Sequence, residues 1–173
     1  MSKKKIIYIS AAAVALVLIA VLIFVLTRVT GEVENFKKIE IDPNAVSITV
    51  EDTAASRGDT VVIPVKLNNN PGVAAIAIAV EYNKDKLLYT GDTAGDIFKS
   101  YQIKEIGNSI GFISVEDGDI DESGAILNLK FKVKKRARKG DTEIKVKVTE
   151  ESLCNFDEEF VSAVGGNAAI TIK

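Results

Sequence analysis

The chain has 173 residues and a formal net charge of −2, and it contains one cysteine and no histidine. This charge balance provides no strong positive field, which excludes a nucleic-acid backbone as the expected partner. Without histidine, the commonest general base and the usual nitrogen ligand of zinc are missing. The single cysteine, Cys154, cannot form an internal disulfide, and its apolar neighbours predict a buried small hydrophobe.

An apolar run opens the chain. Residues 6–26 are apolar except for Tyr8 and Ser10, and a helix of this length would cross a hydrocarbon layer of roughly 30 Å. Three lysines at residues 3–5 precede the run and favour a cytoplasmic N-terminus. We therefore predict a cytoplasmic tip at residues 1–5, a single-pass transmembrane anchor at residues 6–28 and an extracellular C-terminal domain. A cleaved signal peptide is the alternative, although no Ala-x-Ala site follows the run.

Residues 29–44 are polar, include the turn signal Asp42-Pro43-Asn44 and predict a linker to a domain at residues 45–173. From Val46 onward, apolar residues alternate with a period of two, which is typical of half-buried strands. The expected strands lie at residues 46–50, 61–67, 73–82, 110–115, 126–133, 144–148 and 168–172. Pro64 places its strand at a sheet edge or a bulge, since proline cannot donate to the ladder. Many short strands without a helical period predict an all-β sandwich or jelly roll.

Four segments of this domain resemble the cohesin family. They read GDTVVIPV at residues 58–65, VEYNKDKL at residues 80–87, GDI at residues 95–97, and FKVK at residues 131–134 followed by GDT at residues 140–142. The resemblance implies an antiparallel jelly roll of about nine strands. It also implies a flat face, built partly from the third, fifth and sixth strands, that receives the helices of a dockerin domain.

The strand at residues 73–82 has two contrasting sides. Alternation places on one side Ile76, Ile78, Val80 and Tyr82, which are expected to face the core. The other side carries Ala75, Ala77, Ala79 and Glu81. A solvated strand face would normally carry polar residues, so this apolar side predicts a docking surface for another protein. Two alternatives remain open: a loop or second layer covers the alanines, or the whole strand is central and buried.

The resemblance to cohesins extends the candidate partner-binding set. It places at dockerin-contacting positions Ile113, Glu116, Gln102 and Lys104. Ala75 and Ala77 stand where well-studied cohesins carry an asparagine and an aspartate that hydrogen-bond the dockerin. The resemblance therefore implies a more apolar interface in this chain.

Other chemistry finds little support in the sequence. The acidic run at residues 117–121 has calcium-loop spacing but lacks the required glycine and bidentate glutamate, so we predict a solvated hairpin and no metal. The basic run at residues 132–139 predicts a solvated or wall-facing patch, with binding to an anionic surface polymer as the alternative. Tryptophan is absent, and a sugar-binding platform would need Tyr89 and Tyr101 exposed side by side.

No constellation of side chains indicates catalysis or a cofactor, so the chain is not predicted to be an enzyme. We predict a non-catalytic, membrane-anchored module that docks a dockerin-type or other protein partner on a flat strand face. A structural or adhesive β-sandwich subunit of a surface complex is the first alternative, and a carbohydrate-binding module is the second.

Overall fold

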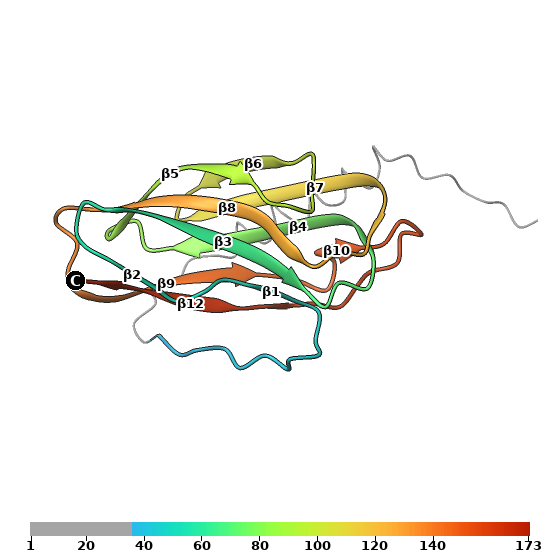
Figure 1. Ribbon diagram of the computed structural model, residues 1–173, viewed down its shortest axis with the longest axis horizontal. Helices are drawn as coiled ribbons and strands as arrows, with labels where there is room; N and C mark the ends of the chain where they lie inside the picture. Colours follow the sequence, from blue (N-terminus) through green and yellow to red (C-terminus); the bar gives the residue numbers. More distant parts are fainter. Residues whose placement is uncertain (1–35) are drawn as a thin grey trace, which may run out of the picture.

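The computed structural model describes residues 36–173 as twelve strands without a helix (Figure 1). One sheet has five strands in the order β11-β1-β3-β8-β5. Its strands are β1 (Ser47–Thr49), β3 (Thr60–Asn68), β5 (Leu87–Ala94), β8 (Gly124–Val133) and β11 (Val164–Gly165). Within the described range, no helix is long and apolar enough to cross a membrane. The predicted anchor at residues 6–28 lies outside the described residues.

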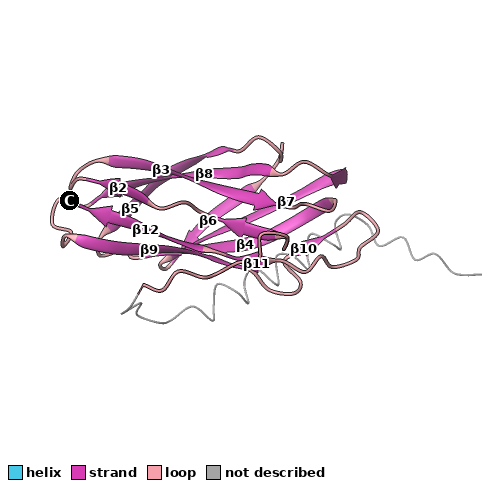
Figure 2. Cartoon of the chain, turned by 60° about the horizontal axis from the view of Figure 1, so that its bottom comes forward, coloured by secondary structure: helices cyan, strands magenta, loops and turns pink. Residues whose placement is uncertain are grey.

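The second sheet has seven strands in the order β2-β12-β9-β4-β7-β6, with β10 also paired to β4. These strands are β2 (Thr53–Ala55), β4 (Val73–Tyr82), β6 (Gln102–Ile106), β7 (Ser109–Ile120), β9 (Gly140–Lys147), β10 (Leu153–Cys154) and β12 (Asn167–Ile172). Pairing is antiparallel except between β1 and β11 and between β2 and β12. The two sheets lie face to face (Figure 2), which confirms the predicted all-β sandwich.

The strand count differs from the expected nine because three stretches of chain each form two short strands. β1 belongs to the five-stranded sheet and β2 to the seven-stranded sheet, and β11 and β12 divide in the same way. β9 and β10 pair with different parts of β4, β9 with residues 79–82 and β10 with residues 75–76. Switching between sheets lets the first and last strands form one edge of each sheet, while β5 and β6 form the other edges.

The core lies between the sheets and contains the side of β4 that alternation assigned to it. Ile76, Ile78, Val80 and Tyr82 are all at most 4% exposed and belong to one apolar cluster. Phe131 of β8 stands opposite them, with its ring centroid 4.9 Å from that of Tyr82. The period-two pattern therefore predicted this face of the strand correctly.

Pro64 occupies a stretch of β3 that has a partner on one side only. β1 pairs with residues 66–68 and does not reach Pro64, and a register shift with β8 follows directly between Val65 and Lys66. The missing N–H of proline therefore removes no hydrogen bond from a fully paired ladder. This placement agrees with the expected edge or bulge.

Gly95 lies against the backbone of β8 and gives a test of the packing there. A Cβ atom on Gly95 would lie 2.1 Å from the carbonyl oxygen of Ala125, so the backbone would have to move. We expect Gly95→Ala to lower the free energy of unfolding by about 1–3 kcal/mol, measured by urea denaturation. Gly118→Ala is the control, because nothing lies within 4 Å of its Cβ position. Equal effects of the two substitutions would contradict this account.

Candidate protein-binding face

The outer side of β4 carries a second apolar cluster, separate from the core between the sheets. This outer cluster consists of Ala75, Ala77, Ile113 and Cys154, with Val115 packed against it. The register explains the grouping, because Ala75 pairs with Val115 across β4 and β7, and Ala77 pairs with Ile113. Cys154 comes from β10, where it pairs with Ala75. Three strands therefore place small apolar side chains on the same outward face.

The alanines of this face are buried. Ala75 is 1% exposed, Ala77 and Ala79 are 0% exposed, and Ile113 is 7% exposed. Of the alternatives that the sequence left open, a buried alanine side agrees with these values better than an open apolar stripe does. Partly exposed Val115 remains at the border of the outer cluster.

Glu81 continues the same side of β4 beyond Ala79 and brings charge to it. Its carboxylate lies 3.5 Å from the ammonium group of Lys147 on β9. Partial burial raises the pKa of Glu81 above its usual range, and the charge of Lys147 opposes this rise. The β9 side of the face thus ends in a half-buried ion pair.

Gln102 and Lys104 lie on β6, the edge strand of this sheet, and both are exposed. Gln102 pairs in register with Ile113, and Lys104 pairs with Gly111. Both residues therefore flank β7 next to the outer cluster. They form the polar border that a protein ligand would meet at this edge.

Glu116 has a structural role in addition to its predicted position near the partner. Its Oε1 atom accepts hydrogen bonds from the backbone N–H groups of Lys99 at 2.9 Å and Ser100 at 3.3 Å. The carboxylate therefore holds the segment before β6 against β7. A substitution at Glu116 would change both that segment and any contact with a partner.

The strands expected from the sequence did not include the hairpin that follows β9. Leu153 and Cys154 form β10, Cys154 bridges to Phe160, and the backbone N–H of Phe156 donates to Asp119 at 2.7 Å. Phe156 and Phe160 are 60% and 55% exposed, and three acidic residues separate them in the sequence. The spacing of two phenylalanines around an acidic run is the signal that could have identified this hairpin. It ends beside the outer cluster.

Cys154 is buried as expected. Burial raises the pKa of its thiol, and the nearby charges of Glu158 and Asp119 raise it further. The thiol therefore stays protonated at neutral pH. A buried protonated thiol contributes to the apolar packing of the outer cluster and has little reactivity.

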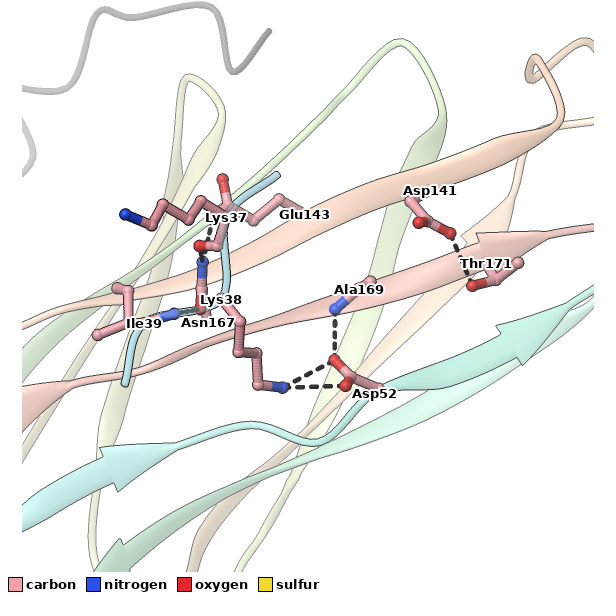
Figure 3. Close-up of polar contacts among 9 residues, drawn as sticks. All are labelled: Lys37, Lys38, Ile39, Asp52, Asp141, Glu143, Asn167, Ala169 and Thr171. Atoms are coloured by element: carbon pink, nitrogen blue, oxygen red, sulfur yellow. Dashed lines mark hydrogen bonds and ion pairs between the residues drawn. The ribbon is translucent and has the colours of Figure 1, made fainter. Parts of the chain in front are cut away.

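A strap at residues 36–41 crosses the other half of this face, over β12 and β9 (Figure 3). The side chain of Asn167 holds it, because its Oδ1 accepts the N–H of Ile39 at 2.8 Å and its Nδ2 donates to the carbonyl of Lys37 at 2.7 Å. The same amide group donates to Glu143 at 2.6 Å. The strap belongs to the described part of the predicted linker, residues 36–44, and it leaves the half formed by β4, β7 and β6 as the candidate face.

An ion pair supports the strap nearby. The Lys38 ammonium group lies 2.9 Å from the Asp52 carboxylate, which also accepts the N–H of Ala169 at 2.8 Å. The N–H of Ala169 and then Lys38 hold the pKa of Asp52 below its usual range. A lowered carboxyl pKa stabilises the fold above the ordinary value of 3.8, and this contribution is lost as the pH falls further.

Asn167→Ala should release the strap. The amide is 3% exposed and makes three hydrogen bonds, so we expect a loss of about 1–3 kcal/mol in unfolding free energy and faster hydrogen exchange at the Ile39 amide. Asn128→Ala is the matched control, since its side chain donates one exposed hydrogen bond to Ala94 in the other sheet. Unchanged exchange at Ile39 in the Asn167 variant would show that the strap is held by other contacts.

Tyr89 and Tyr101 do not form an open platform. Both rings pack against the core, and that of Tyr101 stacks on Phe112 at a centroid distance of 5.5 Å. Both hydroxyl groups donate to Asp92, at 2.5 and 2.7 Å. This geometry disfavours a sugar-binding role for the pair. Within residues 36–173, no group of three or more acidic or cysteine side chains is placed to hold a metal ion.

The chain is similar in sequence to known proteins. Residues 46–169 match a family model described as Cohesin domain. Cellulose-binding protein A of Clostridium cellulovorans is 30% identical over 111 residues, which cover 56% of this chain. The match covers only 6% of the length of that curated relative.

Solved cohesin structures share the fold. The sixth cohesin of scaffoldin B from Acetivibrio cellulolyticus, solved with a Cel5 dockerin, has a TM-score of 0.67 and 22% identity over 75% of this chain and 99% of that chain. A type I cohesin–dockerin complex of OlpA from Clostridium thermocellum has a TM-score of 0.65 and 21% identity, covering 75% of this chain and 100% of that chain. A non-cellulosomal cohesin from the archaeon Archaeoglobus fulgidus has a TM-score of 0.65 and 19% identity, covering 75% of this chain and 91% of that chain.

Proposed function

Because the chain belongs to the cohesin domain family, we propose that it is a non-catalytic receptor module that holds a dockerin-bearing protein on the outer face of β4, β7 and β6. The observation that carries this proposal is the outer cluster. It gives a cohesin fold an apolar centre on the side away from its core, with exposed polar residues beside it. This is the composition of a protein-binding patch.

The expected interface is more apolar than one built around hydrogen bonds. Ala75 and Ala77 offer no side-chain donor or acceptor, and their neighbours Ile113 and Val115 offer none either. The polar contacts would come from the border, where Gln102 and Lys104 are exposed on β6. Since the alanines are buried, the partner would contact Val115 and the β6 edge first.

We place this module at the cell surface. The support is the apolar run at residues 6–26 with its preceding lysines, which has the length and charge bias of a single-pass anchor. An anchor of this kind would put the domain outside the cell and hold its partner close to the membrane. Flotation of the full chain with lipid vesicles after alkaline extraction tests this part of the proposal.

A structural or adhesive subunit remains the second candidate function. The observation that favours it is the burial of the alanines, since a cohesin fold with a closed apolar centre could have kept its architecture and changed its partner. Such a subunit would bind its partner through another surface and would not bind dockerins. The binding experiment below separates the two functions.

The test is calorimetry of the fragment 36–173 against a panel of calcium-loaded dockerin domains. The fragment begins at residue 36 so that the strap on Asn167 is retained. Saturable binding that disappears when a chelator unfolds the dockerin is expected. Absence of binding across the panel, with a folded fragment, would reject the receptor function and favour the structural subunit.

A further inference from the structure

The two ends of the sandwich carry opposite charge. At one end, the turn between β7 and β8 and the hairpin after β9 meet, since Phe156 donates to Asp119. Acidic residues at this end come from the last part of β7 and the turn after it (Glu116, Asp117, Asp119, Asp121 and Glu122) and from the segment between β9 and Phe160 (Glu150, Glu151, Asp157, Glu158 and Glu159). The opposite end contains the turn between β8 and β9, at residues 134–139. Although the net charge of the chain is small, its positive and negative charges are separated between the two ends of the sandwich.

The turn at residues 134–139, called here the basic loop, projects its charges into solvent. Exposed cationic side chains occupy every position but one: Lys134, Lys135, Arg136, Arg138 and Lys139. The exception is Ala137, which is 2% exposed and packs into the core. The N–H of Lys134 also donates to the carbonyl of Lys86 at 2.9 Å. These contacts anchor the middle and the start of the loop, so the cations stand on a defined surface.

None of these five cations forms an ion pair with another of the described residues. Neighbouring turns add Arg57, Lys84 and Lys86 to the same end, together with the carboxylates of Asp59, Asp85 and Asp141. Glu105 also lies there and pairs with Lys84. Cations outnumber carboxylates, and the basic loop has a free positive charge that an anionic partner could neutralise.

The strap brings the chain toward this end. Ile41 lies against Gly166, just before β12, whereas Ile39 and Lys37 both hydrogen-bond to Asn167, so from residue 41 toward residue 36 the strap passes onto β12. Ile172 at the end of β12 pairs with Gly140, directly after the basic loop. Figure 1 shows the strap beginning toward the end of the sandwich where the C-terminus lies. The strap therefore begins nearer to the basic end than to the acidic end.

The distance from the apolar run is short. Residue 36 is ten positions after residue 26, and at full extension this stretch spans at most about 35 Å. A short tether keeps the effective concentration of the domain at the membrane surface high. Each basic residue close to an anionic leaflet then raises the equilibrium constant for contact with the leaflet roughly fivefold. The surface that such a tether presents most readily is the basic end.

From these observations we infer that the basic loop binds anionic lipid headgroups, so that the domain stands on the bilayer with its acidic end and Phe156 directed away from it. This inference rests on the proposed membrane anchor. It gives the basic loop a function that protein binding on the β4, β7 and β6 face does not use. The polarity also orients the receptor, because the hairpin beside the outer cluster then points outward.

The experiment uses the full chain reconstituted into vesicles of phosphatidylcholine alone or with about 30% phosphatidylglycerol. A membrane-impermeant amine-reactive ester modifies exposed lysines, and mass spectrometry gives the rate at each site. Modification of Lys134, Lys135 and Lys139 should be at least about threefold slower in the anionic vesicles. The protection should disappear near 1 M NaCl, where the Debye length is about 3 Å. Lys99 at the acidic end should react equally in both vesicles.

Matched variants test whether the protection depends on the charge of the basic loop. Lys135→Gln with Arg136→Gln should abolish protection of Lys134 and Lys139. Lys66→Gln with Lys99→Gln removes the same charge away from the basic loop, since Lys66 pairs with Ala125 at the start of β8, and should retain the protection. Equal rates in both vesicles would overturn the inference, as would protection that is insensitive to salt. Protection by a soluble anionic polymer but not by phosphatidylglycerol would assign the loop to a wall polymer instead. A chain that floats with neither vesicle would refute the anchor itself, a result distinct from all of these.

Discussion

Replacement of Phe131 by alanine should lower the free energy of unfolding by about 3–5 kcal/mol, the largest stability effect expected for a single residue here. Phe131 is 0% exposed and lies between two aromatic rings, 4.9 Å from Tyr82 and 5.9 Å from Tyr89 between centroids. Its removal leaves a cavity that paired strands on both sides cannot close easily. Urea denaturation of the fragment 36–173, followed by tyrosine fluorescence, measures the change.

Phe160→Ala is the matched control for this prediction. Its side chain is 55% exposed on the hairpin after β9, so the same chemical change should alter the unfolding free energy by no more than about 0.5 kcal/mol. If both variants lost similar amounts, the core between the sheets would not be the main source of stability. If neither lost stability, the packing described for Phe131 would be wrong.

Ala77→Arg should weaken binding of a dockerin partner at least about 100-fold, which corresponds to roughly 2.7 kcal/mol. Ala77 belongs to the outer cluster and is 0% exposed, so arginine would add bulk and an unpaired charge where the proposed interface is apolar. The measurement is calorimetry with a dockerin that binds the unmodified fragment. Retained binding by a folded variant would move the site away from β4.

Val62→Arg is the control for bulk and charge, because Val62 is 52% exposed on β3 in the opposite sheet. It should bind as the unmodified fragment does. Burial of Ala77 means that its variant could unfold, so Lys104→Glu on the exposed edge strand β6 provides a second test. Lys104→Glu should keep the fold and weaken binding about tenfold if the partner reaches β6. Unchanged binding by Lys104→Glu would remove β6 from the interface.

The alternation within β4 was readable from the sequence because a strand turns successive side chains to opposite faces regardless of its surroundings. The core side, Ile76 to Tyr82, followed from this local rule. The turns and the all-β class followed from residue chemistry that acts over a few positions, such as the glycines at residues 58 and 140 with their positive φ angles. Local rules of this kind do not depend on distant parts of the chain.

Exposure of the other side of β4 was decided by tertiary structure. Ala75 and Ala77 pack with Ile113, Val115 and Cys154, and Cys154 lies almost eighty residues further along the chain. The hydrogen bonds of Asn167 to the strap join residues separated by 128 and 130 positions. The periodicity of a single segment does not predict such contacts.

Local pattern and composition were enough to predict a sandwich of short strands, the inward face of β4, the buried state of Cys154 and the likeness to cohesins. Three features depend instead on segments that meet in space: the burial of the alanine face, the strap at residues 36–41, and the gathering of acidic and basic loops at opposite ends. Local patterns do not predict such burial or charge separation, because antiparallel pairing brings together turns that the chain keeps far apart.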